Sequence, residues 1–320
     1  MPMFADLPED ALSFLREWLG ETWGAEPLRG DASVRAYYRI SAGDSRYMLA
    51  YYPESVREQL GRFLRAYDAI SPTTPVPQVV RFCESSVAQA DVGDATLFDL
   101  LHRDRDEAIV QYRRSIDLLV AFQSSAEAAG ALNPKFDAEL FNRELEMTLE
   151  FYAGRLMGTD VGSGVRDELK TLSDNLTRHP YVLCHRDFHG QNIHIINDHL
   201  YVIDYQDLRM GPDTYDLASL LRDRGAGDII GRETELELLS YYRDQLGADE
   251  EIRSRYFETL LQRSLKILGT FAKQAVTRNR RHYLDFIPST IRTIERCLEE
   301  LPAFENLREG FPMTPADTER

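Results

Sequence analysis

The alternation of apolar and polar positions predicts a mixture of strands and helices in the first ninety residues. Apolar residues recur three and four positions apart in the segments 8–18 and 54–70, a spacing typical of amphipathic helices. The segments 36–41 and 46–52 are rich in aromatic residues and flank a Gly-Asp-Ser turn, which predicts a β-hairpin. A further strand or two is expected over 78–90. This region therefore predicts a small sheet with a helix laid against it.

The pattern becomes mainly helical after Gly93. Long apolar periodicities predict helices over the segments 96–102, 107–129, 137–156, 167–178, 234–246, 251–276 and 283–301. One β-rich insert, 181–204, interrupts them, and the tail from Phe304 is expected to be irregular. At about 150 residues per domain, the chain of 320 residues predicts two domains or lobes. We expect a smaller lobe over 1–92 and a larger, mainly helical lobe over 93–320.

Composition and charge narrow the range of partners. Lys and Arg number 37 and Asp and Glu number 53, which gives a net charge of −16. Nucleic acid and anionic lipid both need a surplus of basic residues, so this balance argues against either partner. A nucleotide stays compatible, because a divalent cation neutralises its phosphates locally. The three cysteines are scattered, charges interrupt the first twenty residues, and no stretch approaches the roughly 18 apolar residues of a membrane span. We therefore expect a cytoplasmic protein.

The β-rich insert carries the most informative chemistry. Asn192 opens an apolar strand, the pair Asn197-Asp198 predicts a tight turn, and Asp204 closes the next apolar strand. Two strands joined by a tight turn hold their outer ends side by side, so Asn192 and Asp204 are expected to face one another. An amide oxygen and a carboxylate in that position suit Mg²⁺, which takes few protein ligands and keeps phosphate and water oxygens. The sequence therefore predicts a magnesium site at the end of this hairpin.

A candidate base lies just before the same hairpin. Asp187 precedes Asn192 by five residues, in a polar loop between two strands. A carboxylate beside the metal accepts a hydrogen bond from an incoming hydroxyl and orients it toward a γ-phosphate. Because phosphoryl transfer passes through a loose transition state, alignment matters more than a strong base, so a carboxylate with an ordinary pKa suffices.

Together these residues resemble a known family. His185-Arg186-Asp187, with Asn192 and Asp204 at their spacing, is similar to the protein-kinase-like phosphotransferases, specifically the aminoglycoside phosphotransferase and choline kinase group. The resemblance implies an α+β, two-lobed, protein-kinase-like fold. Its small lobe of sheet and helix, over 1–92, would bind the nucleotide, and its larger, mainly helical lobe, over 93–320, would carry the catalytic and acceptor-binding groups. It also implies ATP and Mg²⁺ as cofactors, Asp187 as the catalytic base, and Asn192 and Asp204 as the metal ligands.

Longer stretches narrow the resemblance. The segments 202–207, 211–223, 30–39 and 262–272 look like those of the anomeric sugar kinases of bacterial cell-wall recycling, which phosphorylate N-acetylmuramate and N-acetylglucosamine at C1. The resemblance runs from about residue 10 to residue 300. It implies a kinase for the anomeric hydroxyl of an N-acetylated amino sugar.

The small lobe departs from the protein-kinase pattern. A kinase is expected to have a glycine-rich loop and then a lysine on the following strand, but Ala50 stands near the lysine's place and the first lysine of the chain is Lys135. Because the small lobe has no lysine, arginine must supply any positive charge that contacts the triphosphate. Arg35 and Arg39 share one face of a strand, although solvated strand arginines would give the same pattern.

Further nucleotide contacts are expected from two places in the small lobe. The loop residue Ser33 is predicted to lie at the phosphates. The segment from Gln89 to Asp91 is predicted to offer backbone groups to the adenine.

Two other functions remain open. The first is the same chemistry on an aminoglycoside or another cationic alcohol, which a net charge of −16 would attract. The second is a nucleotide-binding module without catalysis, raised by the missing lysine. The intact set of Asp187, Asn192 and Asp204 favours an enzyme.

Overall fold

The computed structural model describes residues 7–28, 34–126 and 132–313. The predicted nucleotide-binding residue Ser33 lies outside the described residues. The chain forms two compact units, Met1–Leu132 with Gly190–Leu208, and Asn133–His189 with Arg209–Arg320. The first unit contains residues of both predicted lobes, so a functional boundary after residue 92 stays a prediction.

An antiparallel sheet forms the centre of the first unit. Its strands, in spatial order, are β1 (Gly24–Leu28), β2 (Ala36–Ala42), β3 (Ser45–Tyr51), β5 (Ser86–Ala90) and β4 (Val79–Phe82). The predicted hairpin is confirmed as β2 and β3, and the predicted strands over 78–90 as β4 and β5. β1 was not predicted, because Gly24, Pro27 and the polar Glu26 give it no β-strand pattern.

The first helix of the chain packs on this sheet. α1 (Glu9–Leu19) buries Ala11, Phe14 and Leu15 against one face of the sheet, where they form a core with Tyr38, Ile40, Leu49 and Ala88. The other helical segments of this unit are η1 (Glu54–Val56), α2 (Glu58–Ile70), α3 (Leu97–Arg103) and α4 (Arg105–Gln123). α4 ends at Gln123, whereas a helix was predicted as far as residue 129, and the last part of that prediction, 127–129, lies outside the described residues.

The first unit also contains the hairpin predicted to hold the metal. After a short 3₁₀ turn, η3 (Gly190–Asn192), β7 (Ile193–Ile196) pairs with β8 (His199–Val202). Asn197 and Asp198 form the turn with φ of 49° and 62°. This left-handed geometry is the one that tight hairpin turns require, and Asn and Asp adopt it more readily than most residues.

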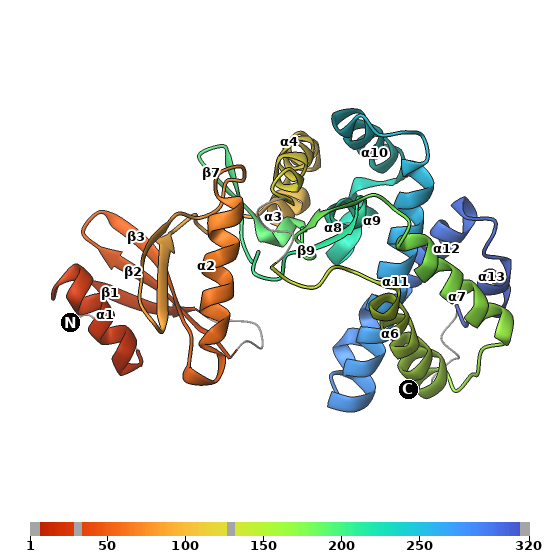
Figure 1. The fold of residues 1–320 in the computed structure, drawn as a ribbon, viewed down its shortest axis with the longest axis horizontal. Coiled ribbons are helices and arrows are strands. Elements are labelled where there is room, and N and C mark those ends of the chain that lie inside the picture. Colours follow the sequence, from red (N-terminus) through yellow and green to blue (C-terminus); the bar gives the residue numbers. More distant parts are fainter. Residues whose placement is uncertain (1–6, 29–33, 127–131, 314–320) are drawn as a thin grey trace. The chain divides into compact units, whose positions relative to one another are not determined.

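The second unit is mainly helical (Figure 1). Its helices are α6 (Ala138–Thr148), the π-helix η2 (Leu149–Leu156), α7 (Ser163–Leu176), α8 (Tyr215–Arg222), η4 (Asp223–Gly225), α9 (Ala226–Ile230), α10 (Arg232–Leu246), α11 (Ile252–Arg278), η5 (Arg281–Phe286), α12 (Ile287–Glu300) and α13 (Glu305–Gly310). β6 (Tyr181–Cys184) pairs with β9 (Arg209–Pro212). The tail was predicted to be irregular from Phe304, but α13 forms there and buries Leu307.

The long helix α11 is the centre of the second unit. It packs against α6, η2, α7, α8, η5 and α12. Its approach to α6 depends on Gly269, because a Cβ at this position would lie 2.5 Å from Thr148 Oγ1. Thr148 in turn donates a hydrogen bond of 2.7 Å to the carbonyl of Leu265. In the part of the chain that the structure describes, no helix combines the length and the apolar character that crossing a bilayer requires.

Candidate active site

The hairpin of the first unit places Asn192 and Asp204 at one end. Ile193 pairs with Val202, and the N–H of Ile203 donates to the carbonyl of Asn192 over 3.0 Å. Asp204 follows with φ of 65°. Asp and Asn adopt this left-handed backbone conformation more readily than most other non-glycine residues. Its side chain is exposed, and one carboxylate oxygen accepts a hydrogen bond of 2.7 Å from Gln206 Nε2. The strand register therefore brings the two predicted ligands to the same end of the hairpin.

These two residues fit a magnesium ion. A carboxylate and an amide offer hard oxygen donors, and the exposed Asp204 leaves room for water and phosphate oxygens. Among residues 7–28, 34–126 and 132–313, no group of three or more His, Cys, Asp or Glu side chains is placed to hold a metal. With Asn192 and Asp204 as ligands, a Mg²⁺ ion would take further oxygens from phosphate and water, as Mg²⁺ commonly does.

The loop that carries Asp187 belongs to the second unit and is held by a buried carboxylate. Asp216, at the start of α8, accepts the backbone N–H of His185 over 2.6 Å and that of Arg186 over 2.9 Å. Asp216 is fully buried, which raises its pKa, although the charge of His185 and the two backbone donors act in the opposite direction. Arg186 has φ of 82°, a strained conformation of the kind found at functional sites. Asp216 thus fixes the backbone directly before Asp187.

A buried arginine supports the same loop from the other side. Arg263 of α11 donates to the carbonyl of Arg186 over 3.3 Å and to Ser219 Oγ over 3.0 Å. It also pairs with the carboxylate of Asp223, and its guanidinium lies 4.3 Å from the ring centroid of Tyr215. Because these partners fix the guanidinium, Arg263 carries a defined positive charge into the region of Asp187.

The surroundings of Asp187 keep its carboxylate ionised. The side chain is open to solvent on one side. The dense packing on its other side, the largest single influence, raises its pKa. The charges of Arg263, His185, His189 and Lys266 together outweigh that effect, so the pKa of Asp187 lies below its usual value. Asp187 is therefore an ionised hydrogen-bond acceptor at neutral pH.

The two arginines of the sheet have different environments. Arg39 pairs with Asp91 over 2.7 Å and with Asp94 over 2.6 Å. A phosphate at Arg39 would have to compete with both carboxylates. Arg35 instead lies between two aromatic rings, 5.7 Å from the centroid of Tyr37 and 5.8 Å from that of Tyr52.

In the segment predicted to hold adenine, some hydrogen-bond donors are already bonded to other groups of the protein. Gln89 Nε2 donates to the carbonyl of Pro77 over 3.2 Å and to the hydroxyl of Tyr205 over 3.3 Å. The N–H groups of Ala90 and Asp91 donate to the carbonyls of Gln78 and Arg46, respectively. Adenine would therefore have to use other backbone groups of this segment, and its predicted contacts to Gln89 and Asp91 stay predictions.

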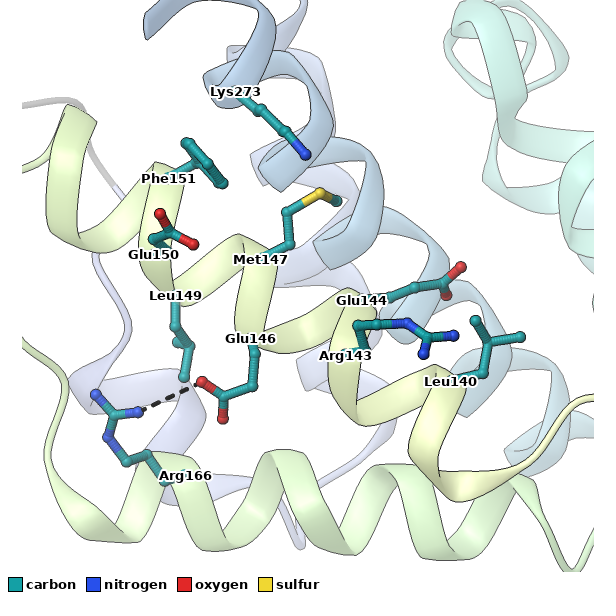
Figure 2. A pocket seen from close by; sticks show the side chains of 10 residues that line it. All are labelled: Leu140, Arg143, Glu144, Glu146, Met147, Leu149, Glu150, Phe151, Arg166 and Lys273. Carbon is teal, nitrogen blue, oxygen red and sulfur yellow. Dashed lines mark ion pairs between the residues drawn. The ribbon is translucent and has the colours of Figure 1, made fainter. Parts of the chain in front are cut away.

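A cavity of about 700 Å³ lies in the second unit. It is lined by residues of α6, η2, α7 and α11, namely Leu140, Arg143, Glu144, Glu146, Met147, Leu149, Glu150, Phe151, Arg166 and Lys273. Figure 2 shows its mixed lining, with Lys273 and Phe151 near one another and an ion pair between Arg166 and Glu146. Glu144, in the wall of the cavity, also contacts Lys266 over 3.2 Å, and the charge of Lys266 lowers the pKa of Asp187.

Comparison with known proteins identifies the family. A model of the phosphotransferase enzyme family matches residues 24–256, well over half of the chain. The chain belongs to that family. This phosphotransferase is 26% identical to the N-acetylmuramate/N-acetylglucosamine kinase of Pseudomonas aeruginosa, over 96% of its own length and 94% of the relative's. It is therefore a small-molecule kinase that acts on hydroxyl groups.

Solved structures confirm the fold of this phosphotransferase. The ADP-bound aminoglycoside phosphotransferase APH(2'')-Ib superposes with a TM-score of 0.63 at 15% identity, covering 95% of this chain and 100% of that one. A choline/ethanolamine kinase family protein from Mesorhizobium loti gives 0.62 at 17% identity, covering 94% and 99%. The predicted α+β, two-lobed, protein-kinase-like fold is confirmed, and so is the predicted family.

Proposed function

We propose that this phosphotransferase moves the γ-phosphate of Mg·ATP to the anomeric hydroxyl of N-acetylmuramate or N-acetylglucosamine, in the cytoplasm. The observation that carries the proposal is the ionised Asp187 on a rigidly held loop, followed in the chain by a hairpin that ends in Asn192 and Asp204. The choice of acceptor rests on the name of a relative that matches along almost the whole chain.

The reaction assigns one task to each group. Asp187 accepts a hydrogen bond from the acceptor hydroxyl and takes its proton as the oxygen–phosphorus bond forms and the bond to the leaving ADP oxygen breaks. Asn192 and Asp204 would hold the Mg²⁺. When bound, that ion neutralises charge on the β- and γ-phosphate oxygens. In this proposal, Asp187 and the hairpin act on one phosphoryl group.

We propose the cavity of the second unit as the acceptor site. Its volume suits a sugar, and Glu144 in its wall contacts Lys266, one of the cations that act on Asp187. Met147→Trp would fill part of the cavity. We expect it to raise the KM for the sugar and to leave the KM for ATP unchanged; an unchanged KM for the sugar would place the acceptor elsewhere.

One assay tests the proposed function. The chain is incubated with Mg·ATP and either N-acetylmuramate, N-acetylglucosamine, kanamycin or choline, and the release of ADP is measured. We expect turnover with one or both sugars and its loss in Asp187→Asn. Turnover with kanamycin or choline alone would contradict the choice of acceptor, and binding of ATP without turnover of any alcohol would contradict catalysis.

An aminoglycoside or amino-alcohol acceptor is the second candidate, because the net charge of −16 attracts cations. The local charges point the other way. Arg263 and Lys266 both lower the pKa of Asp187 through their positive charge, and the same charges oppose a cationic acceptor. A neutral or acidic sugar avoids that repulsion.

A further inference from the structure

The sheet of the first unit places Arg35 where a neighbouring residue could replace the missing lysine. Tyr37 pairs directly with Ala50 across β2 and β3. Because side chains two positions apart on a strand point to the same face, Arg35 and Tyr52 extend from the ends of these strands toward the face of Tyr37 and Ala50. Ala50 is buried and ends at its methyl group. The guanidinium of Arg35 therefore lies on the same face of the sheet as Ala50, which stands near the position of the kinase lysine.

Two interactions act on the guanidinium of Arg35. The guanidinium donates a hydrogen bond to the hydroxyl of Tyr52 and is attracted by the carboxylate of Asp204. Tyr52 is 1% exposed, so its hydroxyl has a fixed place in the core. Burial raises its pKa, which keeps the hydroxyl protonated and neutral. A neutral acceptor holds the guanidinium without cancelling its charge.

Glu58 and Arg39 do not form the lysine and glutamate pair of a protein kinase. In a protein kinase, a glutamate on the helix orients the strand lysine, and α2 begins with Glu58. Glu58 is exposed and pairs with Arg62 on the next turn, over 2.9 Å. Arg39 is bound by Asp91 and Asp94. Arg35 thus differs from Arg39, because a neutral hydroxyl holds its guanidinium and the carboxylate of Asp204 lies near enough to act on its charge.

We propose that Tyr52 is a positioning residue, which holds the Arg35 guanidinium toward the phosphates of the nucleotide beside Asp204. The pair of Arg35 and Tyr52 then replaces the lysine and glutamate pair of protein kinases. The inference rests on the proposed use of Mg·ATP. It names Tyr52, a residue that contacts neither phosphate nor metal, as one that sets the affinity for nucleotide.

A double-mutant cycle tests the inference. The dissociation constant of Mg·ATP is measured by calorimetry for the wild-type chain, Arg35→Ala, Tyr52→Phe and the double variant, together with the KM values for ATP and sugar. We expect Tyr52→Phe to weaken Mg·ATP binding about tenfold, the effect of one lost hydrogen bond to a charged group. The KM for the sugar should stay unchanged. In the Arg35→Ala background, Tyr52→Phe should have no further effect, because Tyr52 acts through Arg35.

Controls separate this role from a structural one. Tyr51→Phe alters the neighbouring residue on the opposite face of β3 and should bind Mg·ATP like the wild-type chain. Arg35→Lys keeps the charge and should bind more tightly than Arg35→Ala. A Tyr52→Phe effect that persists in Arg35→Ala, or no effect in the wild-type background, would overturn the inference alone. If the wild-type chain does not bind Mg·ATP, both the proposed nucleotide and this inference are wrong.

Discussion

The loop of Asp187 and the hairpin of Asn192 and Asp204 are held by different means. The loop depends on side chains far away in sequence, since Asp216 and Arg263 bind its backbone from α8 and α11. The hairpin depends on its own strand register and a two-residue turn, and this backbone alone brings the proposed metal ligands to one end. The proposed base is thus oriented by a buried polar network, whereas the proposed metal ligands are positioned by the local backbone of the hairpin. Each arrangement predicts a different response to mutation.

Replacing the base should have the largest effect. Asp187→Asn keeps the size of the side chain and removes its ability to take a proton, so kcat should fall about 10²- to 10⁴-fold. The measurement is ADP release with sugar and Mg·ATP. Asp228→Asn, an exposed residue of the same unit, is the control and should retain kcat. An Asp187→Asn variant with wild-type kcat would remove Asp187 from the chemistry.

Replacing the metal ligand should mainly change the need for magnesium. Asp204→Asn exchanges an anionic oxygen for a neutral one, so the Mg²⁺ concentration for half-maximal activity should rise about 10- to 100-fold, comparable to the loss of metal affinity when a supporting group is removed. Asp198→Asn in the turn of the same hairpin should leave it unchanged. An unchanged Mg²⁺ requirement in Asp204→Asn would contradict the assignment.

Removing the support of the base should affect stability and kcat together. Asp216→Ala leaves the N–H groups of His185 and Arg186 buried without their acceptor, which should lower the free energy of unfolding by about 1–3 kcal/mol per group. Denaturant titration measures this loss. Asp216→Asn keeps one carbonyl oxygen and should lose less. Equal stability of both variants and the wild-type chain would show that the carboxylate does not hold the loop.

The smallest expected effect is a shift of the pH profile. Lys266 is one of the charges that lower the pKa of Asp187. Lys266→Met should therefore raise that pKa, and the acid limb of kcat/KM, which follows protonation of the base, should move to higher pH. The pH profile of ADP release measures this. Lys170→Met, on the exposed side of α7, should not move it; a shift to lower pH in Lys266→Met would contradict the electrostatic account.

The same contrast explains what the sequence could predict of the site. Asn192, the Asn197-Asp198 turn and Asp204 form one local pattern, and the structure places Asn192 and Asp204 at one end of the hairpin as predicted. Arg263 lies in the segment 262–272 that carries part of the resemblance, but its role was not predicted, because its partners lie forty or more residues away. An acidic residue at a helix start such as Asp216 is common for electrostatic reasons alone, so only the fold reveals its bonds to the loop.

Secondary structure shows a similar limit. The helices predicted from apolar spacing exist, but the segment 137–156 divides into α6 and the π-helix η2, which spacing alone does not distinguish. β9 was not predicted, because Gly211 and Pro212 are poor strand residues. Pairing with β6 overrides that preference. For β9, long-range pairing therefore forms a strand that the local sequence pattern does not predict.

The most direct test of the account compares nucleotide binding and turnover in two variants. Calorimetry gives the affinity for Mg·ATP of Asp187→Asn and Asp204→Asn, and ADP release gives the turnover with sugar. We predict that Asp187→Asn binds Mg·ATP like the wild-type chain and turns over little, whereas Asp204→Asn loses magnesium-dependent affinity. Equal Mg·ATP affinity in both variants, or loss of binding in Asp187→Asn, would contradict the separate roles of base and metal ligand.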